Sequence, residues 1–152
     1  MNAQEYGKEI RRIIQQPDIQ PHGSITFCNV FVMRVAWLFG FLGFDGKTAN
    51  NIYHILKATP YNFQPMGPKP NYKAIAARAS MDPAAFILAA QPGPAHGHVC
   101  IVPPFGGTTF SWKWAKTVCN VSNVGKDVFE NKGLNWAFAK EPEIFLYTGG
   151  AA

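Results

Sequence analysis

The chain has 152 residues, of which 47% are hydrophobic, which is the size of one domain with enough apolar material for one sizeable core. Three cysteines are an odd number without a short-range pairing pattern, so we expect no disulfide framework and at least one free sulfur, and one optional bridge, Cys100 to Cys119, is left open. The formal charge of +5 favours anionic surfaces, which include nucleic acid, acidic lipid headgroups and the bacterial envelope, and does not choose among them.

The sequence predicts neither a secretory signal nor a membrane span. Residues 1–12 lack the basic start and apolar run of a signal peptide. The most apolar stretch, residues 27–44, is interrupted by Arg34, Gly40 and Gly43, which favours a buried helix over a span. We expect a soluble protein that is made in the cytoplasm without a Sec signal and does not insert stably into membranes.

The first half of the chain has the periodicity of helices. An amphipathic pattern runs from the start of the chain to Pro17, which stops it, and a loop with Pro21 and Gly23 leads into a second helix that is apolar on nearly every face. A third helix ends at Thr59 and Pro60, before a proline-spaced loop. The predicted helices cover residues 3–16, 28–42, 47–57 and 72–79.

The second half consists of short apolar runs bounded by Gly, Pro and Asn, which is typical of strands. Helices followed by strands indicate an α+β fold, with an N-terminal helical part packed on a small antiparallel β-sheet in one domain over residues 1–152. The predicted strands cover residues 86–90, 97–103, 108–112, 117–121 and 144–147.

Cys28 is predicted at the first position of the second helix. There its sulfur would lie beside unpaired backbone N–H groups and the positive end of the helix dipole, which favour thiolate over thiol. The same N–H groups could hold an oxyanion. The alternative is a cysteine buried as a small hydrophobe. A helix start that follows a polar loop argues for an accessible sulfur.

His98 is predicted on a strand, with Cys100 on the same face and with Val99 and Ile101 turned to the core. One face would then be apolar and the other reactive, and Gly97 would permit close approach of a backbone or substrate. The alternative for a strand histidine is a structural role. His96, His98 and Cys100 also suggest a zinc site, although residues spaced along one strand diverge and no second ligand pair lies nearby.

A third polar group should accept the remaining N–H of the imidazole. The segment 117–125 offers Asn120 and Asn123 for this role, because an amide oxygen suffices. The alternative is that these asparagines serve only the turn that ends the strand.

Several segments together resemble the CHAP/NlpC-type cysteine amidohydrolases and peptidases of bacterial cell-wall turnover. The resemblance implies a papain-like fold, with Cys28 as nucleophile, His98 as base and Asn123 as third residue, since similar sequences carry Asn-Val-Gly after the same strand. Asn120 is the second choice. Cys100 departs from the pattern, where a small residue such as Ala is usual. The segments are 26–32, 49–53, 86–90, 96–102, 122–126 and 135–138.

The resemblance implies hydrolysis of an amide bond in peptidoglycan stem peptides. We expect a monomer that uses no cofactor or metal and does not bind nucleic acid. A hydrolase without a Sec signal fits a phage endolysin or a type VI-type amidase toxin, which would act in the periplasm or on the wall of a target or host bacterium. The toxin would have an immunity protein as partner. The alternative function is a non-catalytic module that binds cell wall or nucleic acid. We expect specificity in the loop 62–70 and the aromatic segment 110–114.

Overall fold

The computed structural model describes residues 1–81 and 83–149 and has mixed helix and antiparallel sheet, as expected for the α+β class. All four predicted helices are confirmed. The second is shorter than predicted, because the chain turns after Trp37 and passes through Gly40 with a φ of 77°. The helices are α1 (Ala3–Ile14), α2 (Cys28–Trp37), α3 (Ala49–Ala58) and α4 (Tyr72–Ala79), with 3-10 turns η1 (Pro17–Ile19) and η2 (Leu134–Trp136).

The described strands form one antiparallel sheet in the order β1-β7-β2-β3-β5-β4, with β6 also paired to β5. All five predicted strands are present, and two further strands were not predicted. β1 lies in the proline-spaced loop and forms by pairing with β7, and the polar β6 forms by pairing with β5. The strands are β1 (Phe63–Pro65), β2 (Ile87–Gln91), β3 (His98–Val102), β4 (Thr108–Ser111), β5 (Lys116–Asn123), β6 (Phe129–Gly133) and β7 (Glu143–Tyr147).

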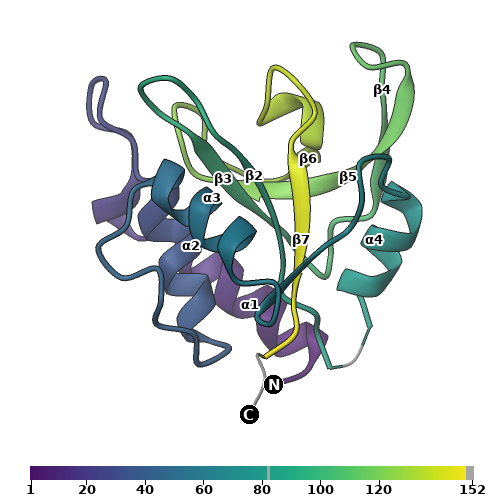
Figure 1. The fold of residues 1–152 in the computed structure, drawn as a ribbon, viewed down its shortest axis with the longest axis horizontal. Helices are drawn as coiled ribbons and strands as arrows, with labels where there is room; N and C mark the ends of the chain where they lie inside the picture. The colour runs from purple at the N-terminus through teal and green to yellow at the C-terminus, as the bar shows by residue number, and fades with distance from the viewer. Residues whose placement is uncertain (82, 150–152) are drawn as a thin grey trace.

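Helices cover both faces of the sheet, as Figure 1 shows, with α1, α2 and α3 on one side and α4 on the other. Val99 and Ile101 of β3 pack in the core beneath the first three helices. Cys100, which alternates with them, is fully buried in the second core with α4. The prediction of one apolar and one reactive strand face is therefore wrong at Cys100, since a sheet covered on both sides buries alternate residues in two cores.

Local capping fixes where the helices begin. Asn2 and Glu5 form a capping box at the start of α1, and the Thr48 side chain caps α3 by accepting the N–H of Asn51. The starts of α2 and α3 lie at the upper edge of the molecule in Figure 1, together with the turn between β2 and β3. This edge brings three segments together that are far apart in the sequence.

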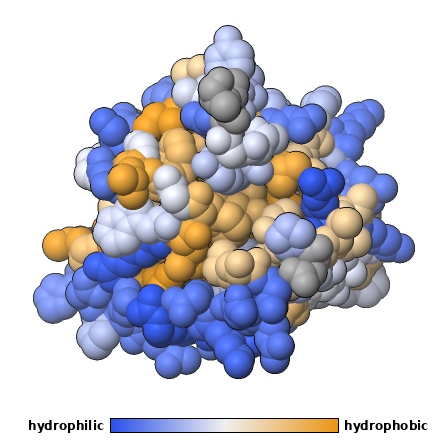
Figure 2. Space-filling view, turned by 90° about the horizontal axis from the view of Figure 1, so that it is seen from below, coloured by the Kyte–Doolittle hydropathy of each residue, from blue (hydrophilic) through white to orange (hydrophobic). Residues whose placement is uncertain are grey.

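The lower face has a different character. Figure 2 shows apolar side chains gathered in the middle of this face, with hydrophilic residues along one side of them. Among the described residues, no helix combines the length and the hydropathy that a membrane crossing requires.

Candidate active site

Cys28 is the first residue of α2, as predicted, and its side chain faces β3. The N-cap residue Phe27 provides no side-chain cap, so the first N–H groups of the helix are left for other acceptors. The backbone N–H groups of Val99, Asn29 and Cys28 lie near enough to the sulfur to lower the pKa of the Cys28 thiol. Since Val99 follows His98 directly, the Cys28 sulfur lies next to the beginning of β3.

The Cys28 side chain is more deeply buried than its polar loop suggested, with only 6% of the residue exposed. Burial raises the pKa of the Cys28 thiol above its ordinary value and outweighs the three N–H groups, which lower it. The prediction of an accessible cysteine with a lowered pKa is therefore wrong, because the helix start packs against the sheet. The resting group is a thiol at neutral pH.

His98 begins β3 and is half-buried. Its Nε2 lies 2.6 Å from Oδ1 of Asn123, the last residue of β5. The Asn123 amide is itself oriented, because its Nδ2 donates to the carbonyl oxygen of Asp127 at 2.9 Å. With Oδ1 turned to the ring, the hydrogen-bond network assigns the proton to Nε2 in the neutral imidazole and leaves Nδ1 with a free lone pair.

Packing holds the His98 ring in a narrow slot. The Phe138 ring lies edge-on to it with centroids 5.0 Å apart, and a Cβ added to Gly125 would lie 3.1 Å from the ring carbon Cε1. Burial lowers the pKa of His98 below its ordinary value, and the hydrogen bond that the ring donates to Asn123 partly offsets this by raising the pKa. The imidazole is therefore neutral at pH 7.

Asn120, the second choice for the third residue, lies in a different network. Its Oδ1 accepts the Thr109 hydroxyl at 2.7 Å, and its Nδ2 donates to the Gly106 carbonyl at 2.9 Å. These bonds tie β5 to β4 and the segment before it. Of the two asparagines, Asn123 is the one that contacts His98.

A pocket of about 360 Å³ opens above Cys28. Thr26 and Asn29 line it from the start of α2, Thr48 from the start of α3, and His96 from the turn between β2 and β3. His98 does not line this pocket, although it directly follows the lining residue Gly97. The pocket walls combine hydroxyl and amide side chains with small apolar residues, which suits a peptide-like ligand.

Asn50 also lines this pocket, and its role was not predicted from the sequence. Its Nδ2 donates to the Gly93 carbonyl at 3.1 Å, and its Oδ1 accepts the Gly93 N–H at 3.0 Å. A Cβ on Gly97 would lie 2.5 Å from the Asn50 Oδ1, so only glycine fits there. Asn50 therefore fastens the turn that precedes His98 to α3.

The zinc alternative finds no support in the geometry. Within residues 1–81 and 83–149, no three His, Cys, Asp or Glu side chains are gathered as a metal site, and Cys100 lies in the second core, away from the exposed His96. All three cysteines are free in the described structure, so the optional bridge between Cys100 and Cys119 is not formed.

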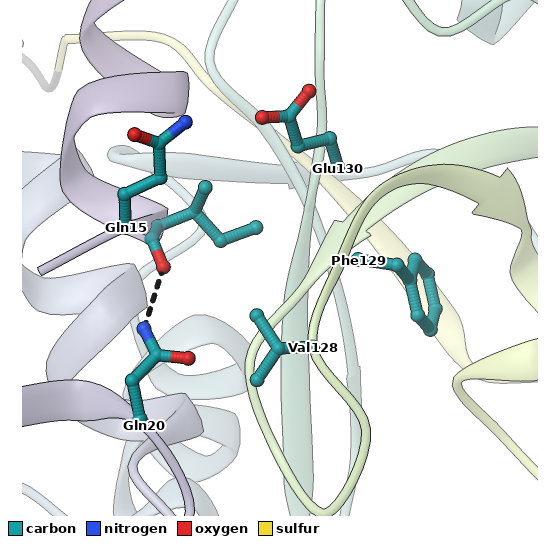
Figure 3. Close-up of a pocket in the computed structure, with 6 residues that line it drawn as sticks. Gln15, Gln20, Val128, Phe129 and Glu130 are labelled. Carbon is teal, nitrogen blue, oxygen red and sulfur yellow. Dashed lines mark hydrogen bonds between the residues drawn. The ribbon is translucent and has the colours of Figure 1, made fainter. Parts of the chain in front are cut away.

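A second pocket, of about 350 Å³, lies between the end of α1 and the start of β6. Figure 3 shows Gln20 turned toward α1, where its Nε2 donates to the Ile14 carbonyl at 2.9 Å, and Val128, Phe129 and Glu130 opposite. No thiol or imidazole lines it, and we place no chemistry there.

The segments expected to set specificity do not line the pocket above Cys28. Part of the loop 62–70 forms β1 at the edge of the sheet. The aromatic segment 110–114 forms the tip of the hairpin between β4 and β5, which projects from the same upper edge of the molecule as the turn before β3 (Figure 1). In comparisons with known proteins, no family model, curated protein or solved structure matches the chain.

Proposed function

We propose that this protein is a papain-like cysteine amidohydrolase that cuts an amide bond in the stem peptides of peptidoglycan. The supporting observation is the placement of three groups: Oδ1 of Asn123 faces Nε2 of His98, and the backbone N–H of the residue after His98 lies near enough to the Cys28 sulfur to lower the pKa of its thiol. A thiol, an imidazole and an orienting amide in this relation can carry out acyl transfer. The choice of peptidoglycan depends on the sequence resemblance.

In the proposed mechanism, Nδ1 of His98 takes the proton of the Cys28 thiol while the sulfur attacks the peptide carbonyl carbon. The negative charge moves to the carbonyl oxygen, which the backbone N–H of Cys28 helps to hold. The imidazolium then gives its proton to the leaving amine, and the C–N bond breaks. Water, deprotonated by His98, attacks the thioester and releases the acid and the thiol.

The pKa directions favour a neutral resting pair over a preformed ion pair. Burial raises the pKa of the Cys28 thiol and lowers that of the His98 imidazole, so both groups are uncharged at pH 7. The proton must then move during attack, and Asn123 stabilises the imidazolium that forms. This role explains why an amide oxygen at 2.6 Å from Nε2 is useful.

A non-catalytic binding module is the second candidate, and the burial of Cys28 favours it. Labelling with iodoacetamide near pH 6 separates the two, because an inert buried thiol reacts hardly at all. We expect Cys28 to react at a rate that falls when His98→Ala removes its base. Equal labelling in both proteins would favour the binding module.

The direct test is digestion of purified sacculi, with mass spectrometry of the released fragments. We expect Cys28→Ala to abolish release and Cys100→Ala, which alters a cysteine in the other core, to keep it. His98→Ala should lose nearly as much as Cys28→Ala, because groups that act as a unit show non-additive losses. Undiminished release by folded Cys28→Ala would refute the proposal, and the fragment masses identify the bond that is cut.

The asparagines provide a matched pair for the third role. Asn123→Ala should lower kcat by a smaller factor than His98→Ala, and Asn120→Ala should leave kcat unchanged, because its bonds go to Thr109 and Gly106. A larger loss from Asn120→Ala would reverse the assignment. The biological setting, endolysin or secreted toxin with an immunity protein, stays a prediction.

A further inference from the structure

The hairpin between β4 and β5 presents aromatic side chains to solvent. Trp112 is 88% exposed and Phe110 is 47% exposed, and their rings meet edge-on with centroids 4.9 Å apart. Large aromatic side chains dominate binding energetics because each brings a wide apolar surface at little cost in conformational entropy. Two of them side by side at one tip form a candidate binding surface.

The hairpin tip is held in place before any ligand arrives. Ser111 pairs with Lys116 across the hairpin, and the Ser111 hydroxyl accepts the N–H of Trp114 at 3.1 Å. Nζ of Lys113 donates to the Phe138 carbonyl at 3.5 Å, which ties the tip to the segment that packs on His98. The aromatic pair is therefore connected to His98 through Lys113 and Phe138.

A third exposed aromatic ring lies on the neighbouring segment. Trp136 is 65% exposed, and Nζ of Lys132 lies 5.2 Å from the centre of its ring. Lys113 links the hairpin to Phe138, two residues after Trp136. Lys113 and Lys132 make no ion pair with a carboxylate in the described part of the chain. The surface combines apolar rings with two cations.

We propose that Phe110, Trp112 and Trp136 form a glycan-binding surface that holds the sugar strand of the cell wall while a stem peptide occupies the pocket above Cys28. The identity of this ligand rests on the proposed function. A pyranose ring offers an apolar C–H face to an aromatic ring, and its hydroxyl and acetamido groups need polar neighbours, which the exposed Thr108 and Thr109 supply. The two lysines complement the carboxylates of the wall.

A polymer explains why this surface and the pocket lie apart on one edge of the molecule. Figure 1 shows the hairpin at one end of the upper edge and the turn before β3 nearer the other end. A short peptide would reach only the pocket, whereas a glycan strand with attached peptides can contact both. The hairpin should therefore affect binding to sacculi and leave cleavage of a small soluble stem peptide unchanged.

The test measures co-sedimentation with purified sacculi, using Cys28→Ala as the parent so that nothing is cut. We expect Trp112→Ala to weaken binding roughly two- to twelvefold, since an aromatic contact contributes about 0.5–1.5 kcal/mol, and Trp112→Phe to retain most of the binding. The control is Tyr61→Ala, which removes a 73% exposed ring beyond the opposite end of α3. Both tryptophan variants should fold, because the side chain is solvent-exposed.

Glycan strands stripped of their stem peptides, and vesicles of anionic phospholipid, identify the ligand. Binding to the stripped strands that Trp112→Ala weakens supports the proposal. Unchanged binding of Trp112→Ala to sacculi, or Trp112-dependent binding to vesicles with none to stripped strands, would overturn it. If the tryptophan matters for sacculi but the protein with Cys28 releases no fragments, this surface stands and the hydrolase proposal fails.

Discussion

Gly125→Ala tests how tightly the His98 ring must be held. The new Cβ would lie 3.1 Å from Cε1 of the ring and 3.6 Å from Nδ2 of Asn123, so the ring must yield by a few tenths of an ångström. Phe138 packs against the ring and limits that movement. We expect a loss of kcat of about tenfold, because misplacement by a full 1 Å can cost about 100-fold, and a stability loss of about 1–3 kcal/mol from overpacking.

Gly106→Ala is the matched control. Its Cβ would lie 3.1 Å from the Asn120 carbonyl oxygen, so an equally tight contact arises at a buried glycine beside the other asparagine. Both variants should unfold at similarly lowered urea concentrations, and only Gly125→Ala should release fragments from sacculi more slowly. Equal activity of the two variants at matched folded fractions would refute the idea that the slot around His98 sets the rate.

Three further results are expected. The acid limb of kcat/KM should lie below pH 6.5, because His98 must be neutral, and should move to lower pH in Asn123→Ala, which removes the bond that raises its pKa; an upward move would contradict this. Tyr6→Phe should raise the free energy of unfolding by about 1 kcal/mol, because the Tyr6 hydroxyl is buried without a hydrogen-bond partner among the described residues; a lowered melting temperature would contradict this. The free energy of unfolding, measured with urea, should fall above pH 9. Burial raises the pKa of the Cys100 thiol and brings that of Cys119 to about 12, so in this pH range these thiols ionise only in the unfolded state. The slope should be about 1.4 kcal/mol per pH unit for each thiol, and Cys119→Ala should reduce it by one such contribution, whereas an unchanged slope would contradict the assignment.

The helices were predictable because their signals are local. The spacing of apolar residues predicted α1. An apolar run after a polar loop predicted that Cys28 is the first residue of α2. The burial of Cys28 was not predictable, because it depends on β3, whose residues come about 70 positions later along the chain. Local sequence places a residue on an element, and tertiary packing decides what covers it.

The pairing of His98 with Asn123 was expected from the family resemblance. The spacing of residues along the sequence alone does not distinguish Asn123 from Asn120 as the partner of His98. Both residues lie on β5, and the difference comes from which strand each one faces. The role of Asn50 was missed for the same reason, since its partner Gly93 lies 43 positions away. Side chains that bridge distant segments leave no periodic signal.

The position of β7 has a consequence for synthesis of the protein. β7 lies between β1 and β2, although it follows every residue of the candidate site in the chain. A growing polypeptide on the ribosome therefore lacks the strand that joins β1 to β2 until about residue 147 has emerged. Long-range strand pairing is also slow. Because Phe145 of β7 belongs to the same core as Cys28 and Val99, a nascent chain would complete the core around the candidate site only after β7 has paired with the sheet.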